Sequence, residues 1–366
     1  MRIDKRTGSW LLAGLALYNV VVWIDLLVFG RKLIDEAAPD FTNGRWMLSI
    51  VLMLAAVAAW RAVLSLALPH AASQAEVQQA SQWSTEDRWS SIGTLVLHVG
   101  AMLLFVYAPY WFCWAVIEDH PVENASAVFW FVGTAFAVAA YLKARRHAET
   151  PRFQLILLLA LCVFTFVSGM EEVSWFQRVF SIKTPAVIAH FNSQGELNFH
   201  NMMTNILENY FYNGMSVLLV LIPSMNALGA IRLHDLKLGV MVPRAYLVTV
   251  GAIAAAYNYD MWDIPHFQVA LYMSVLLLWT LAWRTESRAD RTILLMTIVA
   301  AVVGQVVFLS FGDHYIRLWD ITEYKEMFMP LGAMLYAWNV FVAIKRAEPS
   351  VTRSRTAQEP FAIRAH

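Results

Sequence analysis

Long apolar stretches separated by short polar ones dominate the sequence. Ten of these stretches approach the roughly 20 residues that an α-helix needs to cross a bilayer. They lie at about residues 9–29, 45–68, 91–117, 125–143, 153–172, 202–223, 243–258, 266–283, 292–312 and 327–345. The pattern predicts an all-α fold, a polytopic integral membrane helix bundle of about 10 transmembrane helices in a single domain over residues 1–345. Residues 346–366 are polar, and we expect a disordered cytoplasmic tail there.

The composition agrees with a membrane protein. Of the 366 residues, 59% are hydrophobic and 15% are charged, whereas soluble domains carry about 25% charged residues. The net charge is zero and no basic stripe is present, which argues against a nucleic-acid partner. Cys113 and Cys162 lie inside apolar stretches and predict no disulfide framework. The first apolar stretch lacks a cleavage pattern, so we expect it to remain as a membrane helix.

The positive charges are distributed unequally between the two sides of the predicted bundle. An even number of spans places both termini on one side, and 20 lysine and arginine residues fall on that side against 7 on the other. Lysine and arginine accumulate in cytoplasmic loops, so the distribution predicts that both termini are cytoplasmic.

Most of the unusual polar residues then fall at the outer face. The richest segment runs from Gly169 to Ser216, at the end of the fifth apolar stretch and into the sixth. Ionisable groups next to a bilayer are costly and are commonly functional. Candidate groups at this face are Asp25, Glu118, Asp119, His120, Glu171, Glu172, Gln177, Arg178, Asn192, Gln194, Glu196, His200, Tyr259, Asp260, Asp263, His266, Asp313, His314, Asp320, Glu323 and Glu326.

The sixth apolar stretch carries a polar stripe. Its members recur at spacings of three and four and therefore share one helix face. They are Asn201, Asn205, Glu208, Asn209, Tyr212, Asn213 and Ser216. An ion that faces lipid costs roughly 2.5–3.5 kcal/mol on insertion scales, so we expect the stripe to face the bundle interior or a hydrated space. The alternative is that the asparagine side chains only join neighbouring helices.

Two acidic pairs have competing interpretations. Glu171 and Glu172 point about 100° apart on a helix, so we expect Glu172 to face a site while Glu171 pairs with Arg178 or faces the interface. Glu323 and Glu326 share a face at the start of the tenth helix. The spacing of Asp320 and Glu323 is also that of a capping box, which would explain Glu323 but leaves Glu326 unexplained.

Two histidines receive different interpretations. His200 follows Glu196 by four residues, so on a helix the two could share a metal ion or a proton. His98 lies within the third apolar stretch, and we interpret it as a residue that packs helices together.

Carboxylates and a histidine at one membrane face suit a divalent metal ion or general acid–base catalysis. Oxygen ligands favour Mg, Ca or Mn, and mixed ligands favour Zn or Fe; burial can tune a carboxyl group for proton transfer. The expected cofactor is a divalent ion (Zn, Mn, Mg or Fe), although no HExxH, DDxxD, GxSxG or Walker motif is present. The candidate residues are Glu171, Glu172, His200, Glu208 and Glu326 for catalysis, Gln177, Arg178, Asn198, Asn201 and Asn205 for substrate binding, and Glu172, His200, Glu323, Glu326 and Asp313 for a metal.

The strings EEVSWFQRVF, TP and NSQGELNFHN resemble a segment of uncharacterised bacterial multi-pass membrane proteins. That family shares an E-E-[IV]-S-W-x-Q-R-[IV]-F segment, a Thr-Pro and an N-x-Q-x-E-x-N-x-H-N segment. Phe176 stands where a glycine is expected. The resemblance covers about 35 residues; it implies a bacterial cytoplasmic membrane protein in which this segment acts as a unit, and it implies no reaction.

Three functions fit these residues. The first is a membrane-embedded enzyme with an outward, periplasmic site that acts on a lipid or polyprenyl-linked substrate, with Arg178 holding an anionic head group such as phosphate. The second is a proton- or cation-coupled transporter or channel lined by the polar stripe, with Glu208 as its ion site. The third is a non-catalytic membrane subunit or assembly factor. The inner half of the sixth stretch is apolar, which favours a one-sided site over a pathway through the membrane.

Overall fold

The computed structural model describes residues 5–28, 43–67, 82–147, 150–177, 179–192, 197–198, 204–231, 238–258, 265–317 and 319–346. Within these ranges every regular element is helical, as predicted. The elements are α1 (Lys5–Val28), α2 (Asn43–Ala67), α4 (Thr85–Tyr107), α5 (Pro109–Trp114), α6 (Pro121–Ala144), α7 (Arg152–Glu172), η2 (Ser174–Phe176), α8 (Ala186–Phe191), α9 (Thr204–Ser216), the π-helical turn η4 (Val217–Leu221), α10 (Ile222–Ala227), η5 (Gly239–Met241), α11 (Leu247–Ala256), α12 (Pro265–Arg284), α13 (Arg288–Ser310), η6 (Gly312–His314) and α14 (Asp320–Arg346).

Seven helices in the described ranges are long and apolar enough to cross a membrane, namely α1, α2, α4, α6, α7, α13 and α14. The remaining predicted stretches also contain helix, in α9–η4–α10, α11 and α12. The length and composition of these helices therefore confirm a multi-pass membrane bundle. The count of ten spans and the side of the membrane on which the termini lie stay predictions. The tail over 346–366 lies outside the described residues apart from Arg346.

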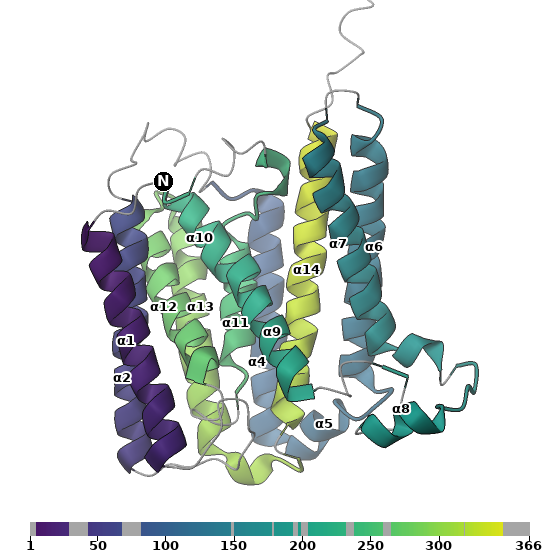
Figure 1. Cartoon of the computed structure of the whole chain (residues 1–366), viewed down its shortest axis with the longest axis horizontal. Helices are drawn as coiled ribbons and strands as arrows, with labels where there is room; N and C mark the ends of the chain where they lie inside the picture. Colours follow the sequence, from purple (N-terminus) through teal and green to yellow (C-terminus); the bar gives the residue numbers. More distant parts are fainter. Residues whose placement is uncertain are drawn as a thin grey trace, which may run out of the picture.

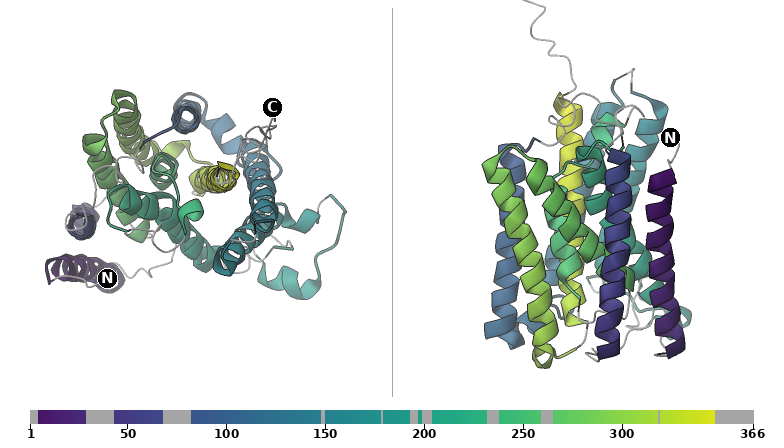
Figure 2. Two further views of the ribbon diagram at one scale, coloured as in Figure 1. Left: turned by 90° about the horizontal axis from the view of Figure 1, so that it is seen from above. Right: turned by 90° about the vertical axis from the view of Figure 1, so that its left-hand side faces the viewer.

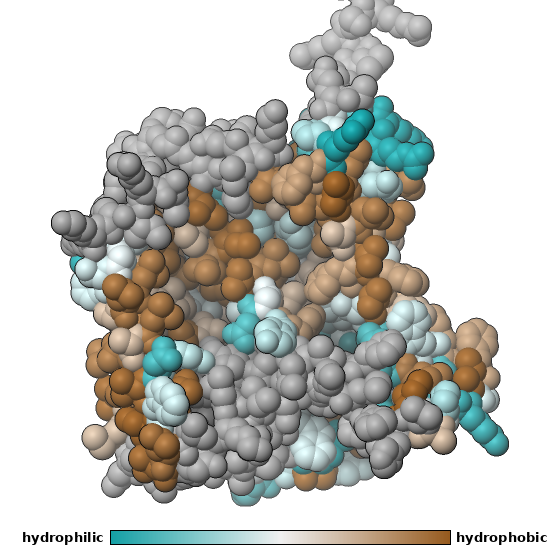
Figure 3. Space-filling model, viewed as in Figure 1, coloured by the Kyte–Doolittle hydropathy of each residue, from teal (hydrophilic) through white to brown (hydrophobic). Residues whose placement is uncertain are grey.

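The helices form one bundle that exposes apolar side chains around its circumference. Figure 1 and Figure 2 show the helices running roughly in parallel, with the start of α1 and the end of α14 at one end. The pair α6–α7 packs beside α14, and the pair α1–α2 packs beside α12. Leu12, Val96, Ile156 and Val299 are among the exposed apolar residues, and hydrophobic atoms cover much of the described surface in Figure 3. Such a surface suits lipid.

The seventh apolar stretch, at about residues 243–258, contains α11 and lies at the centre of the bundle. Helix α11 has only ten residues, and every one of them is buried. It packs against α4, α12, α13 and α14. Its sequence is apolar on all sides, as expected for a helix surrounded by protein.

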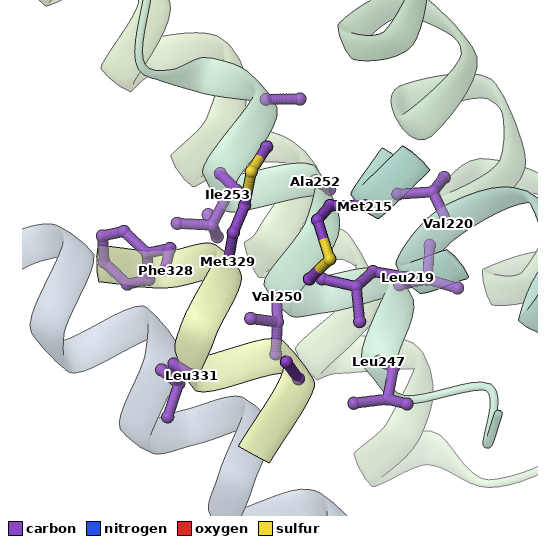
Figure 4. Packing of buried hydrophobic residues seen from close by; sticks show 14 of the residues in the cluster. Met215, Leu219, Val220, Leu247, Val250, Ala252, Ile253, Phe328, Met329 and Leu331 are labelled. Atoms are coloured by element: carbon purple, nitrogen blue, oxygen red, sulfur yellow. The ribbon is translucent and has the colours of Figure 1, made fainter. Parts of the chain in front are cut away.

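Close approach of three elements depends on two glycines. Leu219 of η4 packs against Gly251 of α11 and Gly332 of α14. A Cβ atom at Gly251 would lie 2.5 Å from Val220 Cγ2, and one at Gly332 would lie 2.4 Å from Leu219 Cδ1. Figure 4 shows Leu219 and Met215 beside Val250 of α11. Small residues allow membrane helices to approach in this way, and here they let η4 pack against α11 and the middle of α14.

We expect Cys113 to resist thiol reagents in the folded protein. It lies in α5, beyond the end of α4, and its Sγ atom donates to the carbonyl oxygen of His314 at 3.5 Å. Burial raises the pKa of the Cys113 thiol to about 11. Since the thiolate is the reactive form, this pKa shift alone lowers the rate at which Cys113 reacts with a thiol reagent near neutral pH roughly 100-fold, relative to a thiol with the ordinary pKa.

Maleimide labelling before and after unfolding in SDS measures this protection. Cys162 is also buried, so we expect both cysteines to react only after unfolding. Rapid labelling of the folded protein would contradict the position of α5 against η6.

Candidate functional site

Four carboxylates from three helices converge at one end of the bundle. Glu172 ends α7, Glu208 lies in the second turn of α9, and Glu323 and Glu326 lie near the start of α14. Glu323 interacts electrostatically with Glu326, Glu172 and Glu208. We call Glu172, Glu208, Glu323 and Glu326 the acidic cluster. The end where α7 stops and α9 and α14 begin is opposite to the start of α1 (Figure 1).

Tyr212 connects the polar stripe of α9 to this cluster. Its side chain is buried, and its hydroxyl group donates a hydrogen bond to Glu326 Oε1. Ser126 of α6 donates to the backbone oxygen of Glu326 at 3.1 Å. The stripe therefore faces the bundle at Tyr212, as its spacing predicts, and Glu326 is held from two neighbouring helices.

Lys325 provides a positive charge within the same group. It is 2% exposed, and its Nζ atom lies 4.8 Å from the centroid of the Tyr212 ring. Glu326 and Glu208 attract the ammonium group. A buried charge is stable only when opposite charges and hydrogen bonds compensate for lost water, so Lys325 and the acidic cluster depend on each other.

Asn258 and Gln305 hold Lys325 from the interior side. The ammonium group donates to Asn258 Oδ1 at 2.5 Å. The Asn258 amide nitrogen donates to the Ala255 oxygen at 2.9 Å, which directs Oδ1 towards the lysine. Gln305 Nε2 donates to the Asn258 backbone oxygen at 3.2 Å. A connected set of side chains thus extends from the cluster into the bundle between α11 and α13.

His98 has the packing role that the sequence analysis predicts. It is fully buried, and its ring nitrogens lie 2.9 Å from the Tyr257 hydroxyl oxygen and 3.0 Å from the Ala300 carbonyl oxygen. The ring also fits against Gly304, where an added Cβ atom would lie 2.7 Å away. His98 therefore joins α4 to Tyr257, which follows α11, and to α13.

The chain leaves α7 through a left-handed turn next to the cluster. Ser174, Trp175 and Phe176 have φ angles of 45°, 54° and 57°. Each residue other than glycine costs about 1–2 kcal/mol in this conformation. Trp175 Nε1 donates to Glu171 Oε1 at 2.7 Å, so Glu171 has a tryptophan partner that the sequence analysis does not foresee. Strain of this kind clusters at functional sites.

Gln177 and Asn198 organise the loop after this turn. The Gln177 amide donates to the Ile182 oxygen at 3.0 Å and accepts from the Leu197 backbone at 2.6 Å. Asn198 donates to Ser174 Oγ at 3.0 Å, and Asn192 donates to Asn198 Oδ1 at 2.8 Å. Both predicted substrate-binding residues therefore have a structural role, and their contact with substrate stays a prediction.

Arg317 changes the interpretation of the start of α14. The Asp320 carboxylate accepts from the backbone nitrogen of Arg317 at 2.9 Å and from its guanidinium group at 2.7 Å. Asp320 is thus engaged by the preceding turn, and Glu323 interacts with the other acids. The capping box suggested for Asp320 and Glu323 stays a prediction.

The other predicted residues are not all brought together. Asp313 is exposed in η6, at the end of α13. Among the described residues, no group of three or more His, Cys, Asp or Glu side chains is arranged to hold a metal ion. The predicted residues outside the described part are Arg178, Gln194, Glu196, His200, Asn201, Tyr259, Asp260 and Asp263, together with the side chains of Asp25, Asn205, Asn209 and His266.

Sequence patterns alone did not indicate a role for Lys325, Asn258 or Gln305. Lys325 was one of the seven positive charges on the outer side, although its position between two acids in an apolar helix is a signal of burial. Asn258 and Gln305 are uncharged, and nothing in their spacing indicates that they meet. Comparisons with family models, with curated proteins and with solved structures find no match for this chain.

Proposed function

We propose that the protein is a membrane-embedded enzyme that performs acid–base chemistry on a lipid or polyprenyl-linked substrate at the acidic cluster. The observation that supports this proposal is that Glu323 interacts electrostatically with Glu172, Glu208 and Glu326, which come from three helices. Convergence of carboxylates at one end of a bundle has no packing advantage, because like charges repel.

The cluster offers both partners of a proton transfer. Neighbouring carboxyl groups in a site of low dielectric constant share protons, so one can donate while another accepts. Tyr212 orients Glu326 by a hydrogen bond, and Glu326 and Glu208 attract the ammonium group of Lys325. We assign Glu326 and Glu172 as the acid and base pair.

An amphiphilic substrate matches the position of the cluster. Glu172 and Glu326 lie at the ends of α7 and α14, two of the helices suited to cross the membrane. Phe164 and Val167 expose apolar side chains on α7. A lipid can therefore place its head group at the carboxylates while its chains stay in the bilayer. In the predicted orientation this is the periplasmic end, and Arg178, which lies outside the described residues, is the residue predicted to hold the head group.

Glu326→Gln and Glu172→Gln test the proposal. Lipid extracts are compared by mass spectrometry between cells that produce the wild type and cells that produce each variant in equal amounts. We expect the wild type to change the level of at least one lipid class and both variants to lose this effect, since acid–base groups contribute about 10²–10⁴-fold to rates. Glu286→Gln, an exposed acid before α13, is the matched control. Identical extracts for wild type and both variants would contradict an enzyme that acts on lipids.

A proton-coupled transporter is the second candidate. Lys325, Asn258 and Gln305 continue from the cluster into the bundle, and buried polar groups of this kind mark ion routes in membrane proteins. Proteoliposomes loaded with a pH-sensitive dye distinguish the two functions. Proton flux that is lost in Glu326→Gln, together with unchanged lipids, would favour the transporter.

A further inference from the structure

We propose that residues 174–177 and 179–191, here called the arm, insert their apolar tip into the lipid leaflet at the cluster end of the bundle. The tip consists of Val179, Phe180 and Ile182, which are 73%, 69% and 47% exposed. Three large apolar side chains on one loop are costly in water, and such patches mark protein or membrane contacts.

The loop that carries the tip is held in a defined shape. Ile182 N donates to the Gln177 backbone oxygen at 2.9 Å, and the Gln177 side-chain amide donates back to the Ile182 oxygen at 3.0 Å. Phe180 N donates to the Phe176 oxygen at 3.0 Å. Because these bonds close the loop from within, the exposed tip has a defined shape.

The tip continues a surface that already faces lipid. Phe176 stacks on Phe131 of α6 with ring centroids 6.1 Å apart, and Phe180 packs against Phe176 at 6.4 Å. On α6, the nearby Val128 is 56% exposed. Figure 1 and the left view of Figure 2 show the arm projecting sideways from α6 and α7. The lipid-facing side of α6 therefore extends along an aromatic row onto the arm.

The residues beside the tip suit the boundary between acyl chains and head groups. Lys183 is exposed next to Ile182, and a lysine can keep its ammonium group in water while its stem lies on an apolar surface. Trp175 is partly exposed and bonds to Glu171 through Nε1; tryptophan is enriched at membrane interfaces. Lipid, rather than a second protein, is therefore the partner of the tip.

The arm links this contact to the acidic end of α7. Its first residues bond to Glu171 through Trp175 and to Asn198 through Ser174. The next step alone rests on the proposed lipid enzyme. In that enzyme the arm keeps the lipid leaflet next to Glu172, and substrates enter the site from that leaflet.

Spin labels on single cysteines test the arm. The full-length protein, with Cys113 and Cys162 replaced by serine or alanine, is labelled at Val179→Cys, Phe180→Cys, Ile182→Cys and Lys183→Cys and placed in phosphatidylethanolamine–phosphatidylglycerol vesicles. Collision rates with oxygen, which concentrates in lipid, and with a water-soluble nickel chelate are then measured. Arg145→Cys, an exposed position after α6, is the water-facing control.

We expect oxygen collisions to exceed nickel collisions at least several-fold at 179, 180 and 182, with the order reversed at 183 and 145. Nickel access at the three tip positions equal to that at 145 would overturn the proposal. Low access to both reagents would also overturn it, because it would show a protein partner on the tip. Neither outcome bears on Glu326→Gln, so failure of the arm and failure of the proposed enzyme are told apart.

Discussion

Lys325→Met is expected to lower the free energy of unfolding by about 3 kcal/mol, the low end of the cost of removing one partner from a buried ion pair. Methionine fills a similar volume but supplies no charge. Glu208 and Glu326, which attract the ammonium group, then lose their counter-charge in a poorly hydrated region. The Asn258 Oδ1 atom also loses its donor. We expect the low end of this energy range because the Glu208 and Glu326 side chains are partly exposed to solvent.

Titration of the purified protein with SDS in mixed micelles measures this loss. Lys183→Met on the exposed arm is the control, and we expect it to stay within about 0.5 kcal/mol of the wild type. The decisive variant is Lys325→Met combined with Glu326→Gln, in which one acid is neutralised together with the base.

We expect the double variant to be about 1–3 kcal/mol more stable than the sum of the two single effects predicts, because the substitutions remove interacting charges. Strictly additive losses would show that Lys325 and Glu326 are not energetically coupled. In that case the charge balance described for the acidic cluster is wrong, whatever the chemistry of the site.

Gly251→Ala is expected to destabilise the protein by about 1–3 kcal/mol through overpacking. The added methyl group would lie 2.5 Å from Val220 Cγ2 and 2.9 Å from Leu219 Cβ. The Leu219 Cβ atom cannot swing away as the end of a long side chain can, so η4 must move. Because η4 continues directly from α9, the shift reaches the helix that carries Tyr212 and Glu208.

Gly100→Ala in α4 is the matched control, since nothing lies within 4 Å of its added Cβ atom. There the substitution exchanges a flexible residue for the best helix former and stabilises by up to about 1 kcal/mol. Thermal unfolding in detergent compares the two variants. Equal melting temperatures would contradict the close approach of η4 and α11.

The membrane character and the polar end of the bundle could be predicted because each depends on local sequence. A bilayer demands about 20 apolar residues per helix, and the apolar stretches at 153–172 and 327–345 correspond to α7 and α14. Acids placed at the ends of such stretches lie at a membrane face whatever the packing. Glu172 and Glu326 were therefore identifiable as candidates without a structure.

The seventh stretch shows a limit of this reasoning. Its apolar residues predict a span, yet α11 has ten residues and is enclosed on all sides. Apolar sequence reports removal from water and does not distinguish lipid from protein as the surrounding medium. Neighbouring helices alone decide between the two.

The turn after α7 shows a second limit. The resemblance leads us to expect glycine at Phe176, and this residue has a φ angle of 57°. Glycine tolerates that region without strain. Phenylalanine instead gains a stacked partner in Phe131 of α6, which is distant in sequence. Here the tertiary contact with Phe131 offsets the local preference for glycine. The sequence alone shows only that residue 176 departs from the expected pattern.

The sequence by itself determined that the protein is a multi-helix membrane bundle and that Glu172 and Glu326 lie at the ends of apolar stretches, because hydropathy and helix period act over a few turns. Only the tertiary structure decided which of the acids interact, that Lys325 is buried among them, that Asn258 accepts a hydrogen bond from it, and that Gln305 in turn bonds to Asn258. These contacts join residues 47–114 positions apart. Contacts between residues so far apart in sequence depend on how the helices pack, and no local sequence pattern predicts that packing.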